Sequence, residues 1–174
     1  MKTPRLLSGA ARTLGLAGLA IGMLAGAVLV PGEGALAQYR QKLTNDAAKC
    51  RGKGPAVRVA VTGVKSSTGV VRVQLYRATK QEWLEKGRWI YRIEVPARAG
   101  TMSVCMPVPA PGSYAIAVRH DVNGNGETEL TKDGGGVSNN PSFNIFNLGK
   151  PSYSKAAFPV ANEVKSISIT VHYM

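Results

Sequence analysis

The segment A-V-R-V-A-V-T-G-V, residues 56–64, alternates apolar and polar side chains along its length. Val57, Val59 and Val61 share one face of an extended chain, a pattern typical of a half-buried strand. After a short polar turn, the segment V-V-R-V-Q-L, residues 70–75, repeats the alternation. We therefore expect two neighbouring strands joined as a β-hairpin.

Further segments with the same two-residue period lie downstream. They are residues 89–95, 102–106, 114–120 and 164–173. Each is bounded by Gly, Pro or polar turn residues, and no segment shows sustained helical periodicity. Thr79-x-x-Glu82 matches a capping box, so we expect one short helical turn there, with Trp83 as a lid on the core.

Many short strands with frequent turn signals predict an all-β fold. The specific expectation is an antiparallel Greek-key β-sandwich of immunoglobulin-like or transthyretin-like type with one short helical turn. Tyr114 follows the turn Pro111-Gly112-Ser113, an arrangement similar to the tyrosine corner of such sandwiches.

The N-terminus has the pattern of a signal peptide. Lys2, Arg5 and Arg12 precede an uncharged apolar stretch, and Ala35-Leu36-Ala37 supplies the small-residue cleavage site. We expect residues 1–37 to be removed, residues 38–55 to form a lead-in segment and residues 56–174 to form the sandwich domain. A retained membrane anchor is the alternative, and export to the periplasm or the medium follows from both interpretations.

The formal net charge of +12 favours contact with anionic components of the cell envelope. The basic residues are spread along the chain, so a solvated basic surface without a specific partner is the alternative. A nucleic-acid partner is not expected. Cys50 and Cys105 both lie in the exported part, where an even pair is typically oxidised, and we expect them to form a disulfide.

The segment from Val118 to Phe143 concentrates polar and glycine residues between two predicted strands. It contains the spacing D-x-N-x-N-G-x-x-E, formed by Asp121, Asn123, Asn125, Gly126 and Glu129. Alternating Asp and Asn oxygens on a glycine turn are ligands that Ca²⁺ accepts. An EF-hand is excluded, because its twelfth position requires Glu and holds Lys132, and because the flanks are strand-like.

Two interpretations of this loop stay open. In one, the loop binds Ca²⁺ weakly through Asp121, Asn123 and Asn125, with Glu129 or Asp133 as the second carboxylate. In the other, the two Asn-Gly pairs form turns only, because Asn and Gly tolerate positive φ. Gly134-Gly135-Gly136 is expected to make the loop mobile, and the residues from Ser138 to Pro141 are expected to cap or turn the backbone.

His120 beside Asp121 raises the alternative of a small hydrolase, with Ser138 or Ser142 as nucleophile. Neighbouring residues of a strand point to opposite faces, and the chain has no G-x-S-x-G elbow. We therefore expect no enzyme.

Three stretches of the C-terminal two-thirds resemble the bacterial domain of unknown function 2141 family. They are P-G-x-Y-A-x-x-V-x-H-D-x-N-x-N-G at residues 111–126, V-S-N-N at 137–140 and L-G-K-P-S-Y-S-K-A-A-F at 148–158. The signature positions implied by this resemblance are His120, Asp121, Asn123, Asn125, Gly126, Ser138, Asn139, Asn140, Gly149, Pro151 and Phe158. The resemblance implies an exported, single-domain β-sandwich protein and implies no particular activity.

The sequence departs from the family pattern in Glu129, where Asp is usual, and in a shortened stretch before Val137. The expected function is that of an exported, non-enzymatic binding or structural module of the cell envelope, with a candidate Ca²⁺ loop at residues 121–129. A hydrolase and a basic module docking on anionic envelope polymer are the two alternatives.

Overall fold

The computed structural model describes residues 39–142 and 150–174, in which strands predominate. The elements are β1 (Gln41–Leu43), η2 (Ala47–Cys50), β2 (Ala56–Val64), β3 (Val70–Arg77), β4 (Tyr91–Pro96), β5 (Gly100–Pro107), β6 (Gly112–Asp121), β7 (Gly134–Val137), α1 (Tyr153–Ala156), β8 (Phe158–Val160), β9 (Val164–Thr170) and β10 (His172–Tyr173). The predicted signal peptide, residues 1–37, lies outside the described residues and stays a prediction. Within the described residues, no helix has the length and apolar character needed to span a membrane.

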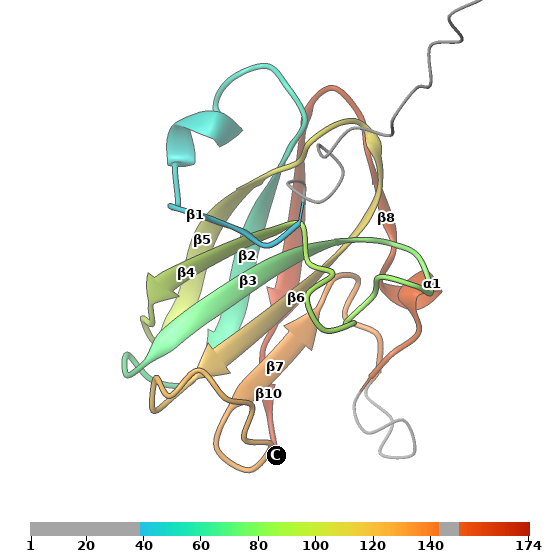
Figure 1. The fold of residues 1–174 in the computed structure, drawn as a ribbon. Helices are drawn as coiled ribbons and strands as arrows, with labels where there is room; N and C mark the ends of the chain where they lie inside the picture. Colours follow the sequence, from blue (N-terminus) through green and yellow to red (C-terminus); the bar gives the residue numbers. More distant parts are fainter. Residues whose placement is uncertain (1–38, 143–149) are drawn as a thin grey trace, which may run out of the picture. The chain divides into compact units, whose positions relative to one another are not determined.

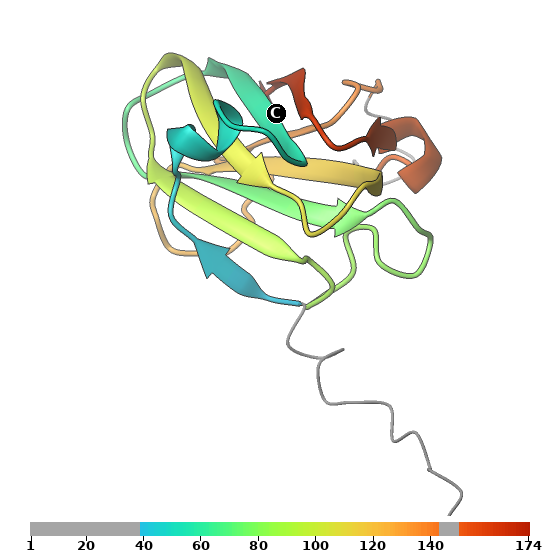
Figure 2. The ribbon, with the colours of Figure 1, turned by 90° about the horizontal axis from the view of Figure 1, so that it is seen from above.

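The strands form two sheets that lie in two layers (Figures 1 and 2). The large sheet has the order β1-β4-β3-β6-β7-β10, and β8 pairs with the same edge of β6 as β7 does. The small sheet has the order β5-β2-β9. Buried side chains from both sheets form the main core between them, so each sheet buries one face against the other.

The all-β prediction is confirmed, whereas the purely antiparallel pairing is wrong. Strand β2 runs parallel to β9, and β1 runs parallel to β4. Parallel partners need a long connection between them, and these pairs join segments far apart in the sequence. Local periodicity reports which residues are buried and carries no information on such distant partners.

The predicted hairpin between residues 56–64 and 70–75 is also wrong. Strand β2 pairs with β5 and β9, whereas β3 pairs with β4 and β6, so the two strands belong to different sheets. Their valine rows face each other across the core, and Val59 and Val73 are both fully buried. The turn between them is an arch that crosses from one sheet to the other. A hairpin and an arch need the same alternation, because each requires only one buried face per strand.

Gly69 closes this arch in a conformation that requires glycine. Its φ is +71°, and a Cβ at this position would lie 2.0 Å from the carbonyl oxygen of Asp121. The arch therefore packs directly on the end of β6, next to the loop of residues 122–133 that joins β6 to β7, which we call the signature loop.

The predicted helical turn near Thr79 is a hydrogen-bonded turn, in which the amide of Trp83 donates to the Thr79 carbonyl at 3.0 Å. Trp83 is buried on the outer face of the large sheet, away from the main core. Its ring meets Tyr76 edge-on at 5.5 Å between centroids, and its Nε1 donates to the Pro151 carbonyl at 2.8 Å. The outer face thus has its own apolar cluster, which covers one end of the sheet.

The lead-in segment contributes structure that its sequence did not indicate. Strand β1 adds to the edge of the large sheet beside β4, and η2 follows with Asp46 as its N-cap. The Asp46 carboxylate accepts the amide of Ala48 at 2.9 Å. The described residues before Ala56 therefore lie within the same compact unit as the rest of the described chain.

The disulfide between Cys50 and Cys105 is confirmed. It joins η2 to β5, and both half-cystines are buried with Ala56. The bond therefore fastens the lead-in segment to the small sheet, whereas β1 fastens it to the large one.

Removing this disulfide is expected to destabilise the fold. The cysteines are 55 residues apart, and a crosslink of that span removes denatured-state entropy worth about 4 kcal/mol in the chain model. The double variant Cys50→Ser/Cys105→Ser should unfold at lower urea concentration than the oxidised parent. Reductant should shift the parent to the variant's midpoint and leave the variant unchanged; an unshifted parent would contradict this role of the bond.

Candidate functional site

Strand β6 carries the candidate site, because its two faces meet different environments. Its inward side chains, including Ile116, Val118 and His120, are buried between the sheets. Its outward side chains, including Arg119 and Asp121, lie on the far face of the large sheet, where the loop after β6 covers them. Neighbouring residues of β6 therefore belong alternately to the core between the sheets and to the contacts that hold the loop after β6.

His120 is a fully buried core residue with both ring nitrogens bonded. Its Nε2 lies 2.8 Å from the Thr68 carbonyl oxygen, which can only accept, so Nε2 carries the proton. In the neutral imidazole, Nδ1 then accepts from the Tyr173 hydroxyl at 2.6 Å. That hydroxyl in turn accepts the amide of Lys65 at 3.1 Å. Burial raises the pKa of Tyr173, which keeps the hydroxyl protonated as a donor.

Asp121 anchors the loop from the other face of β6. It is 3 % exposed, and its Oδ2 accepts the amide of Gly126 at 2.8 Å. Arg119 lies beside it, with Nη2 3.4 Å from the same oxygen and 2.8 Å from the Gly126 carbonyl oxygen. Nη1 of Arg119 also donates to the Thr128 hydroxyl. The second carboxylate oxygen of Asp121 is buried without a hydrogen-bond partner.

The amide side chains of the loop bond within the loop itself. Oδ1 of Asn123 accepts the amide of Asn125 at 3.2 Å, and Oδ1 of Asn125 accepts the amide of Glu127 at 2.8 Å. Both Asn side chains donate to Oε2 of Glu129, at 2.5 Å and 3.0 Å, while Lys132 donates to Oε1 at 2.7 Å. These donors, Lys132 foremost, lower the pKa of Glu129.

Asp133 closes the loop at its other end. It is 6 % exposed, and its carboxylate accepts the amides of Val122 at 3.2 Å and of Glu129 at 3.0 Å. The Asp133 carboxylate thus connects Val122, at the start of the loop, to Glu129, in its second half. The loop is therefore held by hydrogen bonds within itself: backbone amides donate to Asp121 and Asp133, and side chains donate to Glu129.

The predicted Ca²⁺ ligands fit a cation poorly in this arrangement. Asp121, Asn123, Asn125 and Glu129 are all in the loop, but their oxygens bond mainly to neighbouring N–H groups. Within the part of the chain that the structure describes, no group of three or more His, Cys, Asp or Glu side chains is placed to hold a metal ion. Coordination of Ca²⁺ would require several of these hydrogen bonds to be exchanged for metal contacts.

The V-S-N-N segment joins distant parts of the fold. The Ser138 hydroxyl donates to the Ala156 carbonyl and accepts the amide of Ile116 at 3.0 Å. Asn139 donates to the carbonyl of Ala157 at 2.8 Å. Asn140 accepts the amide of Thr170 and donates to the Ser168 carbonyl. Asn139 and Asn140 have φ of 65° and 46°, so the expected backbone-turning role is confirmed. Signature residue Gly149 lies outside the described residues.

The hydrolase constellation does not assemble. His120 and Asp121 point to opposite faces of β6, and the imidazole has no free nitrogen. The Ser138 hydroxyl is buried and bonded at both ends, whereas Ser142 is exposed at the rim of a pocket. Neither Ser138 nor Ser142 is a hydrogen-bond partner of His120, whose ring nitrogens bond to Tyr173 and Thr68.

The glycine run is a strand and not a mobile loop, which corrects the expectation for Gly134-Gly135-Gly136. As β7 it pairs with β6 and β10. A Cβ at Gly134 would lie 2.4 Å from the Tyr173 ring, and one at Gly136 would lie 2.3 Å from the Thr170 carbonyl oxygen. The C-terminal segment thus passes so close to β7 that side chains at Gly134 and Gly136 have no room.

Gly135 differs from its two neighbours. Its φ is not positive, and the nearest atom to a Cβ there is the Val118 carbonyl oxygen at 4.0 Å. Glycine is therefore required here by neither conformation nor contact. It pairs with Arg119 and faces the outer side of the sheet, where a side chain would extend into open space.

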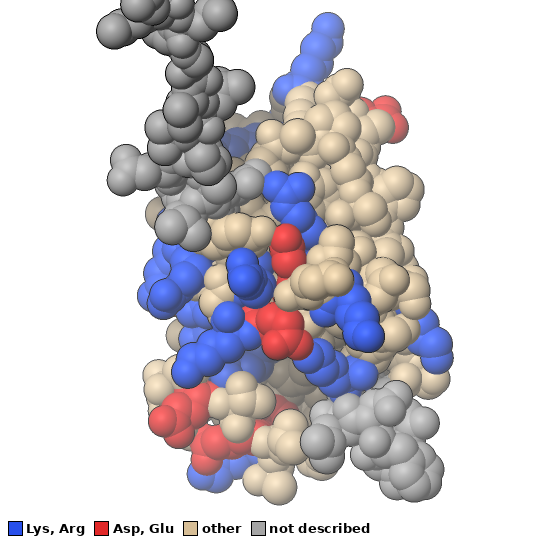
Figure 3. All heavy atoms as spheres, turned by 45° about the vertical axis from the view of Figure 1, so that its right-hand side comes forward, with Lys and Arg blue, Asp and Glu red and all other residues tan. Residues whose placement is uncertain are grey.

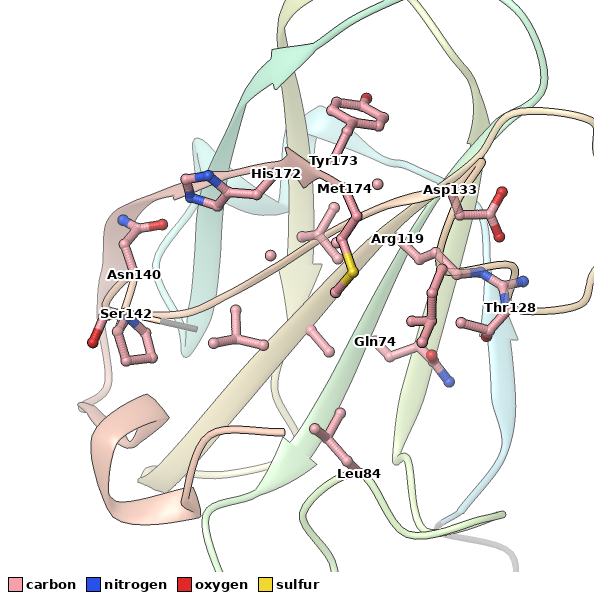
Figure 4. Close-up of a pocket in the computed structure, with 18 residues that line it drawn as sticks. Gln74, Leu84, Arg119, Thr128, Asp133, Asn140, Ser142, His172, Tyr173 and Met174 are labelled. Carbon is pink, nitrogen blue, oxygen red and sulfur yellow. The ribbon is translucent and has the colours of Figure 1, made fainter. Parts of the chain in front are cut away.

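That space is a pocket of about 730 Å³ on the outer face of the large sheet. Its lining is mostly apolar and includes Leu84, Ala117, Leu130, Val137, Pro141 and Met174. Figure 4 shows Gln74, Arg119 and Thr128 on one side, Asn140 and Ser142 on the other, and Leu84 at one end. Thr128, Leu130 and Asp133 of the signature loop form one wall, and the opposite wall is formed by Asn140 of V-S-N-N with the two residues that follow it.

Basic side chains gather on the face seen in Figure 3, with acidic ones among them. On the large sheet, Arg72 lies opposite Arg119 in the β3–β6 register. Glu94 is contacted by Arg72 at 2.6 Å, by Arg92 at 3.8 Å and by Lys42 at 3.9 Å. We call Arg72, Arg92 and Arg119 the arginine cluster. Burial, followed by repulsion from Arg72, lowers the pKa of Arg92 and of Arg119.

Sequence reasoning missed both the pocket and the arginine cluster. The three arginines belong to three different strands, and only the strand order brings them together. One signal was present in the sequence: each arginine stands at one of the polar positions of its alternating segment. Those positions face outward when the apolar positions face the core.

The sequence model of one family matches residues 59–168, most of the described sheets. It is the bacterial domain of unknown function 2141, described as an uncharacterized protein conserved in bacteria. The resemblance expected from the signature residues is therefore confirmed. No curated protein and no solved structure matches the chain.

Replacing Tyr173 with Phe should lower the free energy of unfolding by about 1–3 kcal/mol, because Nδ1 of His120 would be buried without a donor. Urea unfolding checks this value. Tyr153→Phe is the matched control, because Tyr153 is 38 % exposed, and it should change stability little. Equal effects of the two variants would show that the His120–Tyr173 bond contributes nothing specific.

Proposed function

This chain belongs to the bacterial domain of unknown function 2141 family, and we propose that it is an exported, non-enzymatic binding module of the cell envelope. Its ligand is held in the outer-face pocket beside the signature loop. The observation that carries the proposal is the pocket of about 730 Å³, which two signature segments enclose. Its volume falls within the range of about 300–1,000 Å³ that is typical of small-molecule sites.

The signature residues act in this proposal as supports of the pocket walls. Asp121 and Asp133 hold the loop that forms one wall, through amides at both of its ends. Asn139 and Asn140 hold the chain on the other side. Gly135 lies on the floor of the pocket, on the outer face of the large sheet, and its lack of a side chain leaves the space above it free. Walls fixed before binding reduce the entropy lost when a ligand is ordered.

A binding role is favoured over hydrolysis by the arrangement of the candidate catalytic groups. His120 donates and accepts within the core, and Asp121 accepts from the loop on the opposite face. A general base must come within hydrogen-bond distance of the proton it removes, and neither group opens into the pocket lining.

Export is proposed on the N-terminal pattern and on the disulfide. The bond between Cys50 and Cys105 suits an oxidising compartment such as the periplasm or the medium. A Greek-key topology of immunoglobulin-like or transthyretin-like type is the proposed refinement of the fold. Its support is the Tyr114 hydroxyl, which donates to the Ala110 carbonyl at 2.7 Å as in a tyrosine corner.

The pocket predicts binding of a neutral apolar probe. N-phenyl-1-naphthylamine should show saturable fluorescence with the mature parent protein. Gly135→Leu should weaken its binding about tenfold or more, since the new side chain fills the floor of the pocket. The variant should stay folded, because a Cβ at Gly135 meets no atom closer than 4.0 Å.

Gly52→Leu is the matched control, since a Cβ at Gly52 has no neighbour within 4 Å and lies outside the pocket. Circular dichroism should show both variants folded. Equal binding of the probe by Gly135→Leu and by Gly52→Leu would remove the pocket as the site.

Ca²⁺ binding by the loop is a second candidate function with one observation in its favour. Oδ1 of Asp121 is buried and has no hydrogen-bond partner. A cation bound there would satisfy this oxygen, with Asn123, Asn125 and Glu129 rearranged toward it.

This second candidate predicts a higher melting temperature with Ca²⁺, reversed by EGTA, because a ligand bound only by the native state stabilises it. Asp121→Asn should abolish the shift. Mg²⁺ at the same concentration is the control for ionic strength. An unchanged melting temperature in the parent would eliminate the metal site and leave the pocket proposal intact.

A further inference from the structure

We infer that the pocket takes an amphipathic anion, whose apolar body lies over Gly135 and whose carboxylate or phosphate group lies at the arginine cluster. The inference rests on the proposed function of the pocket and specifies its ligand class. It depends on two independent features, the apolar lining and the charge beside it.

The apolar feature is the exposure of large side chains at the pocket. Leu130 is 55 % exposed and Met174 is 76 % exposed, and both line it. Among the described residues, the third exposed large hydrophobic side chain is Tyr153, which is outside the lining. Exposed apolar side chains around an apolar floor gain free energy when a nonpolar ligand removes them from water.

The charged feature adjoins the pocket through two lining residues. Arg119 lines the pocket and belongs to the arginine cluster. Gln74 also lines it and lies opposite Arg92 in the β3–β4 register. Arg72 is on β3, the strand between β4, which carries Arg92, and β6, where Arg119 lies opposite Arg72. The end of the pocket at Gln74 therefore leads onto three guanidinium groups.

The protein compensates these guanidinium groups incompletely. Two carboxylates serve the three arginines: Glu94 pairs with Arg72 and Arg92, and Asp121 pairs with Arg119. The Nε atoms of Arg92 and Arg119 are buried without hydrogen-bond partners. An acidic headgroup over the cluster would offset the mutual repulsion of the arginines, and guanidinium matches carboxylate and phosphate geometry.

A neutral or cationic amphiphile would gain from the apolar lining alone. A hydrophilic anion such as inorganic phosphate would gain from the arginines alone. The two features lie end to end, so the ligand that uses both carries one acidic group at the end of an apolar body.

Isothermal titration calorimetry with single-chain probes of equal tail length tests this inference. Dodecanoate and dodecyl phosphate, each below its critical micelle concentration, should bind the mature parent about tenfold tighter than dodecyltrimethylammonium. Gly135→Leu should weaken every probe. Arg72→Gln should weaken the two anions and leave the cation unchanged. Arg51→Gln is the matched control, because Arg51 is exposed and outside both the pocket and the cluster.

The outcomes separate this inference from the proposed function. Equal affinity for the anions and the cation, with Gly135→Leu weakening both, would overturn the headgroup assignment and retain the pocket. Insensitivity of all probes to Gly135→Leu would overturn both. Binding to phosphatidylglycerol vesicles that Arg72→Gln weakens and Gly135→Leu does not would assign the arginines to a membrane surface, and would also overturn the inference.

Discussion

Strand β6 has to satisfy two environments at once, because its alternate residues face the core and the outer surface of the large sheet. The inward row ends in His120, whose imidazole joins the arch at Thr68 to the C-terminal strand at Tyr173. The outward row ends in Arg119 and Asp121, which hold the signature loop. A shift of register by one residue would place a carboxylate in the core and a histidine in the loop. The rest of the structure depends on this strand keeping its alternation.

The loop that follows β6 is shaped by charge and amide contacts that remain inside it. Backbone amides occupy the carboxylates of Asp121 and Asp133, while the side chains of Asn123 and Asn125 bond to Glu129. A motif whose spacing is typical of a cation site is thus used to build a wall. The same logic applies to V-S-N-N, where Ser138 and the two Asn residues bond to chain segments that approach from elsewhere in the fold. Signature residues of this kind position a surface, and the surface itself is formed by less distinctive neighbours such as Gly135 and Met174.

Particular residues show how far sequence reasoning reached. The pairing of Cys50 with Cys105 could be predicted from the expected oxidising compartment and from the number of cysteines, since two cysteines can pair in only one way. The hairpin did not follow, because the alternation of β2 and of β3 reports one buried face each and is the same in a hairpin and in an arch. The glycine run was misread for a related reason. Glycine disfavours strands by its intrinsic preference, and only the close passage of Thr170, Val171 and Tyr173 makes it necessary at the first and third residues of the run.

The sequence by itself determined the β class, the inward and outward parity of each strand, the family and the position of the signature loop, because these depend on local order along the chain. The tertiary structure decided which strands are partners, and therefore which outward residues meet. The arginine cluster, the open floor at Gly135 and the pocket between the two signature segments all arise from strand order. Contacts between distant segments depend on the packing of whole sheets, and a two-residue period carries no record of them.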